Sequence, residues 1–155
     1  MKSKSVLIKN IAMILFLLAG SLHALATFYW SFGGEIGLMT VGGWTFDMKK
    51  SYGNPLLLIM FLIGLFKLLS TWIPLILYYK NNKVIRFTSY IGAIILIIHG
   101  GVNTVVGWLK LLDIMSVGFK LSFIGQAFIW DPLFLIWGLG LMTFLIIKND
   151  KHKMY

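Results

Sequence analysis

Four long apolar segments separate the polar parts of the chain. They cover residues 11–30, 55–79, 87–109 and 130–147. The hydrocarbon core of a bilayer is roughly 30 Å thick, and an α-helix needs about 20 apolar residues to cross it. Each segment is close to that length. The pattern therefore predicts an all-α protein, a bundle of four transmembrane helices that forms a single integral membrane domain over residues 1–155.

The composition supports a membrane protein. Of 155 residues, 59% are hydrophobic and 12% are charged, whereas a soluble domain is roughly half apolar and a quarter charged. A chain this short cannot bury so much apolar surface in its own core, so membrane lipid is the expected partner. The net charge of +9 lies between and beyond the apolar segments, which argues against a nucleic-acid partner. The absence of Cys excludes disulfides and thiolate metal sites.

Lysine and arginine predict the orientation, because cytoplasmic loops of membrane proteins are rich in both. One side of the predicted bundle collects Lys2, Lys4, Lys9, Lys80, Lys83, Arg86, Lys148, Lys151 and Lys153. The other side has only Lys49, Lys50, Lys110 and Lys120. We therefore predict that both termini are cytoplasmic. Near the outer boundary, an aromatic belt is predicted from Trp30, Trp44, Trp108 and Trp130.

The N-terminus also fits a secretory signal peptide. Basic residues precede an apolar stretch at residues 11–19, and Ala24-Leu25-Ala26 resembles a cleavage site. Cleavage would leave three spans. Because the apolar character continues through residues 27–30, we favour an uncleaved first span.

The two halves of the chain share a pattern. The second and fourth spans each begin with an Asn or Asp followed by a proline, Pro55 or Pro132. This could be local capping chemistry. However, His23 precedes Pro55 by 32 residues and His99 precedes Pro132 by 33. The alternative is two tandem helical hairpins related by an axis along the membrane normal, with the two histidines at equal depth.

Three basic residues are unusual because they lie within apolar segments. His23, Lys67 and His99 are each about 12 residues from the predicted cytoplasmic end of their span, or roughly 18 Å. Asp131 and Glu35 are expected about 15 Å higher, at the outer boundary, so no acid is predicted at this depth. Uncompensated charges are costly in a membrane. Either the three groups are neutral, or an anion or a metal joins them.

Helical periodicity predicts that these side chains face the bundle interior, because small residues share their helix faces. The candidate ligand-binding residues are His23, Trp30, Lys67, His99, Asn103 and Asp131. Structural interpretations stay open: the histidines and Asn103 could form interhelical hydrogen bonds, and Asp131 could be the N-cap of the fourth span. No catalytic residue is predicted.

Several short motifs carry a resemblance to a known family. They are His23, Trp30, Gly33-Gly34, Trp130-Asp131-Pro132 and Gly138. With them the chain resembles an uncharacterised family of small bacterial four-span membrane proteins, classed as a domain of unknown function. The resemblance implies a bacterial membrane, four helices and no assigned activity. Family members have a shorter outer loop after the glycine pair, so no function of that loop is implied for this chain.

Two function hypotheses follow. In the first, an intramembrane polar pocket binds a small lipophilic or anionic ligand, and a carboxylate, quinone oxygen or haem propionate neutralises Lys67. Haem is the sharpest version, because His23 and His99 on different helices could ligate one iron. In the second, the protein is a transporter or an accessory subunit of a larger membrane complex, and the polar residues serve helix packing. Transport by four spans would require a homo-oligomer.

An enzyme is the less favoured class, because the sequence has no HExxH motif and no paired carboxylates within the apolar segments.

Overall fold

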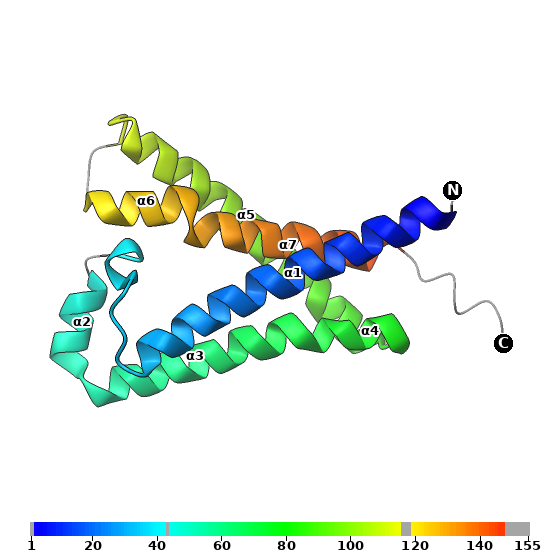
Figure 1. The fold of residues 1–155 in the computed structure, drawn as a ribbon, viewed down its shortest axis with the longest axis horizontal. Helices are drawn as coiled ribbons and strands as arrows, with labels where there is room; N and C mark the ends of the chain where they lie inside the picture. Colours follow the sequence, from blue (N-terminus) through cyan, green and yellow to red (C-terminus); the bar gives the residue numbers. More distant parts are fainter. Residues whose placement is uncertain (1, 43, 116–118, 148–155) are drawn as a thin grey trace.

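Helices account for nearly all of the chain that the computed structural model describes, residues 2–42, 44–115 and 119–147 (Figure 1). In chain order they are α1 (Lys2–Ser31), the 3-10 helix η1 (Leu38–Thr40), α2 (Trp44–Tyr52), α3 (Asn54–Trp72), the 3-10 helix η2 (Ile73–Leu75), α4 (Ile76–Tyr79), α5 (Lys83–Leu111), α6 (Lys120–Phe128) and α7 (Trp130–Ile146). No strand occurs within those ranges. The predicted all-α, four-helix fold is confirmed.

Four helical segments are long and apolar enough to cross a membrane: Lys4–Ser31, Asn54–Tyr79, Lys83–Leu111 and Lys120–Ile146. The chain is therefore a four-helix membrane protein. Its second segment joins α3, η2 and α4 around Pro74, which has no N–H to continue the helix. Its fourth segment joins α6 to α7, and so starts at Lys120 and not at residue 130 as the sequence suggested.

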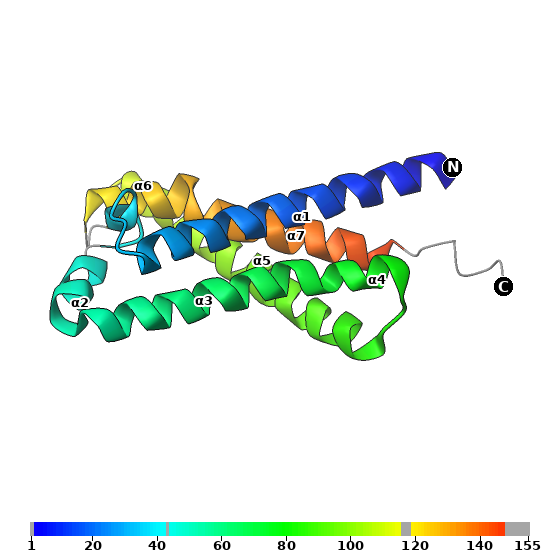
Figure 2. The same cartoon turned by 60° about the horizontal axis from the view of Figure 1, so that its bottom comes forward.

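The four long segments form an open row. Helix α1 packs against both α3 and α7, and α7 packs against α5, which gives the order α3, α1, α7, α5 (Figures 1 and 2). We call the end with the N-terminus, the turn at residues 80–82 and the end of α7 the terminal end, and the opposite end the distal end. Helices α3 and α5 lie close at the terminal end and diverge toward the distal end.

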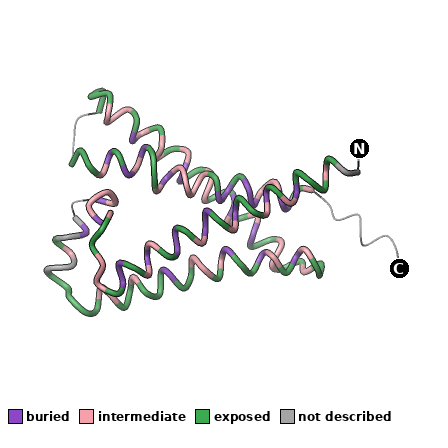
Figure 3. The backbone as a smooth tube through the Cα atoms, viewed as in Figure 1, coloured by how far each residue is buried: buried purple, intermediate pink, exposed green. Residues whose placement is uncertain are grey.

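The best-packed part of the row is the contact between α1 and α7. Phe16 and Phe144 are almost completely buried there, with ring centroids 5.3 Å apart, and buried positions run along both helices (Figure 3). Gly140 allows a close approach, because a Cβ atom at this position would lie 2.9 Å from the carbonyl oxygen of Ala12. Small residues have this role at helix contacts in membranes.

The end of α7 is capped by side chains from two other helices. Lys9 donates to the carbonyl of Ile147 at 2.7 Å, while Arg86 and Tyr90 donate to the carbonyl of Leu145 at 3.3 and 3.1 Å. The last carbonyls of a helix have no partner within it and carry partial negative charge, so cations there are favourable. Lys9 and Arg86 were used above only to predict the membrane orientation. They therefore also connect α1 and α5 to the end of α7. Three others, Lys148, Lys151 and Lys153, lie outside the described residues.

The two halves share one order of elements. In each, a long helix leads to a nine-residue helix, a one-residue break and a helix with proline in its first turn. The breaks differ, because Gly53 has a φ of 53° and Ile129 a φ of −120°. This order supports the tandem-hairpin hypothesis, but the symmetry axis itself stays a prediction.

Substitution of Gly100 by Ala should destabilise the bundle, because the new Cβ would lie 2.6 Å from the carbonyl oxygen of Asp131 and 2.9 Å from the Cα of Leu135. Overpacking of this kind costs about 1–3 kcal/mol. The matched control is Gly92→Ala on the same helix, where a Cβ meets nothing within 4 Å. Thermal unfolding in detergent should give a lower midpoint for Gly100→Ala only. Equal midpoints for the two variants would contradict this packing.

Substitution of Lys9 by Met should also lower the thermal midpoint, because a carbonyl at the end of α7 loses its donor. A buried polar group left without a partner costs about 1–3 kcal/mol. Lys4→Met is the control, since Lys4 is exposed on the same helix. The capping role is wrong if both variants unfold at the same temperature as the unmodified protein.

Candidate ligand site between the helices

A cavity of about 790 Å³ lies between the long helices. Its lining extends from the middle of α3 and α5 to η1 and α6 at the distal end. All six candidate residues from the sequence line it: His23, Trp30, Lys67, His99, Asn103 and Asp131. The fold therefore brings together, around one space, side chains from all four long segments.

Lys67 points from α3 toward α1. Its Nζ atom donates to the hydroxyl of Thr27 at 2.9 Å and lies 3.2 Å from Nδ1 of His23. The same atom lies 5.6 Å from the ring centroid of Phe134. All of these partners are neutral or can be, and no carboxylate in the described ranges comes within 4.0 Å of the ammonium group. A half-buried cation is thus held without a counter-ion.

His23 has one unused polar atom. The residue is 4% exposed. Its Nδ1 faces Lys67, whose charged ammonium group can only donate, so a neutral imidazole there carries its hydrogen on Nε2. Nε2 is buried and finds no hydrogen-bond partner among the described residues. A buried donor in this state is costly. Because Nε2 has almost no accessible surface, an acceptor in the cavity could reach it only if neighbouring side chains moved.

His99 and Asp131 form a second polar group on the other side of the cavity. His99 Nε2 lies 3.5 Å from Oδ1 of Asp131, and the Asn103 amide nitrogen lies 3.2 Å from the same imidazole nitrogen. The side chain of His99 is 53% exposed, whereas Asp131 is buried.

The position of Asp131 corrects two expectations from the sequence. It is not the N-cap of α7, because Ile129 has that position and Asp131 lies in the first turn. It is also not above the histidine layer. It lies about 15 residues from the end of α7, while His99 lies about 16 residues from the start of α5, so both are roughly 23 Å from the terminal end. An acid does lie beside His99.

Phe134 separates the two polar groups. Its ring centroid lies 3.9 Å from that of His23 and 5.2 Å from that of His99. An iron atom between the two imidazoles would require this ring to move, so the geometry gives the haem hypothesis no support. Within the described part of the chain, no group of three or more His, Asp or Glu side chains could hold a metal ion.

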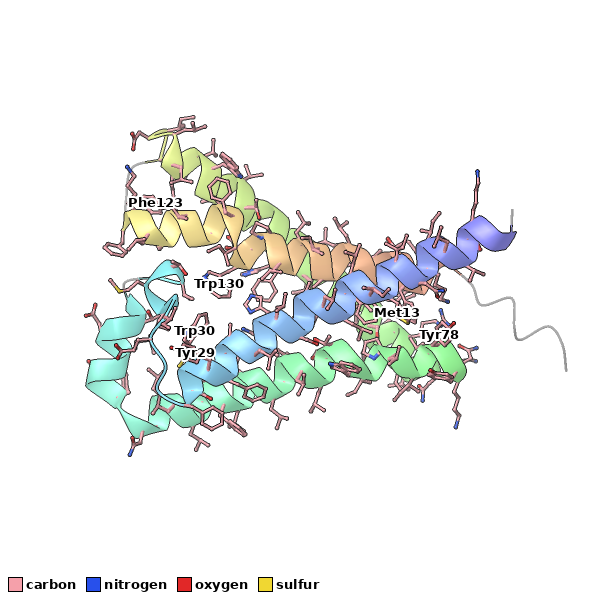
Figure 4. The ribbon with its side chains drawn as sticks, viewed as in Figure 1. Met13, Tyr29, Trp30, Tyr78, Phe123 and Trp130 are labelled. Carbon is pink, nitrogen blue, oxygen red and sulfur yellow. The ribbon has the colours of Figure 1, made fainter. Side chains whose placement is uncertain are left out.

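Two tryptophans line the cavity. Trp30 is 5% exposed and donates to a carbonyl in the following loop at 3.0 Å. Trp130 donates to the hydroxyl of Thr40 at 2.8 Å, and the two indoles meet edge to face at 4.9 Å (Figure 4). The prediction that Trp30 belongs to a lipid-facing belt is therefore wrong. Trp108 is 44% exposed, as a belt residue would be, and the side chain of Trp44 lies outside the described part.

Sequence reasoning missed several cavity residues. Lys110 donates to Gln126 at 3.1 Å and lies 5.4 Å from the ring centroid of Phe123, near the distal end. Lys110 looked like an outer-loop cation, and Gln126 belongs to a helix that was expected to be a connection. The position of Thr27, one turn after His23, was the only available signal for its contact with Lys67.

A known protein family matches most of the chain. A family model, "Protein of unknown function (DUF3995)", matches residues 19–141. The chain belongs to this family. The match spans all six candidate residues and confirms the resemblance to an uncharacterised family. No curated protein and no solved structure matches the chain.

Two further cavities of this DUF3995 protein adjoin the first one. A groove of about 630 Å³ lies between α3 and α5 with α7 as its floor, and it shares Lys67, His99 and Phe134 with the polar cavity. A smaller space of about 290 Å³ lies between α1, α2 and α3. Lys67 lines all three.

Substitution of Trp130 by Phe should loosen η1, because it removes the hydrogen bond to Thr40 while keeping an aromatic ring. A loss of about 1 kcal/mol would make the backbone amides of Thr40 and Val41 exchange roughly fivefold faster. Hydrogen–deuterium exchange followed by mass spectrometry measures this. Trp108→Phe should leave these amides unchanged. Unaltered exchange in Trp130→Phe would show that the indole does not hold η1.

Proposed function

We propose that this membrane protein binds a small anionic ligand in the cavity beside Lys67. The observation that carries the proposal is the pairing of an ammonium group with no acidic partner and a buried imidazole nitrogen with no acceptor. An ammonium group has three N–H donors, of which Thr27 and His23 can occupy two. The third donor is available to an oxygen of a carboxylate or phosphate, and Nε2 of His23 could join it after a small movement of the side chains that cover it.

The energetic scale supports an anion. A lysine at the centre of a membrane helix costs about 2.5–3.5 kcal/mol on insertion scales. Two opposite charges 4 Å apart attract each other by about 4 kcal/mol at an effective dielectric constant of 20. The attraction between one bound anion and Lys67 is therefore similar in size to the cost of placing the lysine in the membrane. The hydroxyl of Thr27 and the ring of Phe134 stabilise the cation only partly, since neither carries a charge.

The orientation of the site follows from the basic residues. The positive-inside rule supports termini on the cytoplasmic side, and the resemblance to a bacterial family supports a bacterial plasma membrane. The cavity lining reaches η1 and α6, so a water-soluble anion would enter from the outer face. The hypotheses of a transporter, an accessory subunit, a homo-oligomer and a haem protein stay untested, and no specific contact described above favours them over ligand binding.

Anion binding should be visible as thermal stabilisation of the purified protein. Sodium butyrate or inorganic phosphate should raise the unfolding midpoint, because a ligand at 100 times its Kd stabilises the folded state by about 2.7 kcal/mol. Lys67→Met should abolish the shift. Lys80→Met should keep it, since Lys80 is an exposed cation at the terminal end. The proposal is overturned if neither probe shifts the unmodified protein, or if Lys67→Met shifts equally.

An internal carboxylate gives a second measurement. In Thr27→Asp the new acid would take the position of the hydroxyl that lies 2.9 Å from Lys67 Nζ. It should neutralise the ammonium group and remove the response to butyrate and phosphate. Thr27→Val, which has nearly the same shape and no charge, should still respond. An undiminished response in Thr27→Asp would place the anion elsewhere.

A further inference from the structure

The groove between α3 and α5 is apolar along most of its length. Its walls come from Ile63, Phe66 and Ile73 on one side and from Ile91 and Ile95 on the other, with other apolar residues between them. The two helices do not close over it, since they diverge from the terminal end (Figure 1). The groove therefore faces the lipid side of the row.

The groove and the polar cavity meet at Lys67. The two spaces share this lysine together with His99 and Phe134. From that meeting point the groove follows α5 toward the terminal end as far as Thr88. Thr88 and His99 are eleven residues apart, or about 16 Å along a helix. Half of a hydrocarbon core of roughly 30 Å is nearly the same length, which is the length of one lipid chain.

We infer that the anionic ligand is an amphiphile with a single hydrocarbon chain, held with its acid group in the polar cavity against Lys67 and its chain in the groove between α3 and α5. This inference rests on the proposed function and identifies the class of its ligand. Charge complementarity places the acid group, and the continuous apolar lining places the chain. A fatty acid and a single-chain phospholipid share this chemistry and differ in the acid, carboxylate or phosphate.

The open side of the groove gives such a ligand a lateral route. An amphiphile dissolved in the bilayer reaches the groove without passing through water, and only its acid group has to enter the polar cavity. In a membrane the chain exchanges one apolar surrounding for another, so it gains little from burial itself. The acid group therefore determines which amphiphiles bind. The size of the groove limits how many hydrocarbon chains the bound amphiphile can have.

Gly92 allows a test that separates the groove from the anion site. It lines the groove, and a Cβ atom there would meet nothing within 4 Å. Gly92→Phe is therefore expected to fill the groove, because its Cβ meets open space. Ser70→Phe fills it from the opposite wall, on α3. The matched control is Gly101→Phe on the same helix as Gly92, since Gly101 lines none of the three cavities and its Cβ would meet only Leu135 at 3.8 Å.

The experiment uses the full chain in nanodiscs and two photoreactive probes with a sixteen-carbon chain, a fatty acid and a lysophosphatidic acid, each with its reactive group near the chain end. At least one probe should label residues of the groove. Labelling should fall at least tenfold in Lys67→Met, Gly92→Phe and Ser70→Phe, and it should persist in Gly101→Phe. The probe that labels more strongly identifies carboxylate or phosphate as the acid.

The outcomes separate the two proposals. If Gly92→Phe and Ser70→Phe keep the butyrate or phosphate shift but lose the long-chain label, the inference holds. If both variants fold, as their thermal midpoints report, and keep full labelling, the chain does not lie in the groove, while the anion site stands. Equal labelling by the uncharged methyl ester of the fatty acid would also overturn the inference. If neither butyrate nor phosphate shifts the thermal midpoint of the unmodified protein, the proposed function itself is overturned.

Discussion

The close contact between α1 and α7 determines the shape of the molecule. Helices that cross at an angle have one region of closest approach and separate on either side of it. Here that region surrounds Phe16 and Phe144, in the half of the row nearer the termini, and the glycine at position 140 makes the approach possible. Toward the distal end the same helices move apart. The polar cavity is the space that this separation leaves.

The charged side chains are distributed unevenly around the cavity. On one side, Asp131 lies 3.5 Å from the imidazole of His99. On the other side, the contacts of the Lys67 ammonium group within the described residues are the Thr27 hydroxyl, the His23 imidazole and an aromatic ring. The ring of Phe134 keeps the two sides apart, so the acid does not compensate the lysine. The side of the cavity around Lys67 therefore offers a positive charge in a largely apolar surrounding, where electrostatic attraction is screened less than in water.

Much of the fold could be predicted because apolar length is a strong signal. The similar depths predicted for His23, Lys67 and His99 from the rise of a helix agree with their position around one cavity. The start of the fourth span could not be predicted. Residues 120–128 form α6, which a break at Ile129 separates from α7. Pro132 explains the break, because it has no N–H to donate to the carbonyl of Phe128, but it gave no sign that the segment before it is helical. That error put Asp131 too high and hid its contact with His99. Phe134 carried no signal, because it is one apolar residue among many in its helix.

The position of Lys67 on the walls of three cavities has a thermodynamic consequence. Any molecule that contacts this ammonium group from one cavity changes the field that a second molecule meets in another. Such coupling is reciprocal, so the factor by which the first occupant alters the affinity of the second equals the factor in the reverse direction. If ligands bind as proposed, occupancy of one cavity would therefore change the affinity of another through this one side chain.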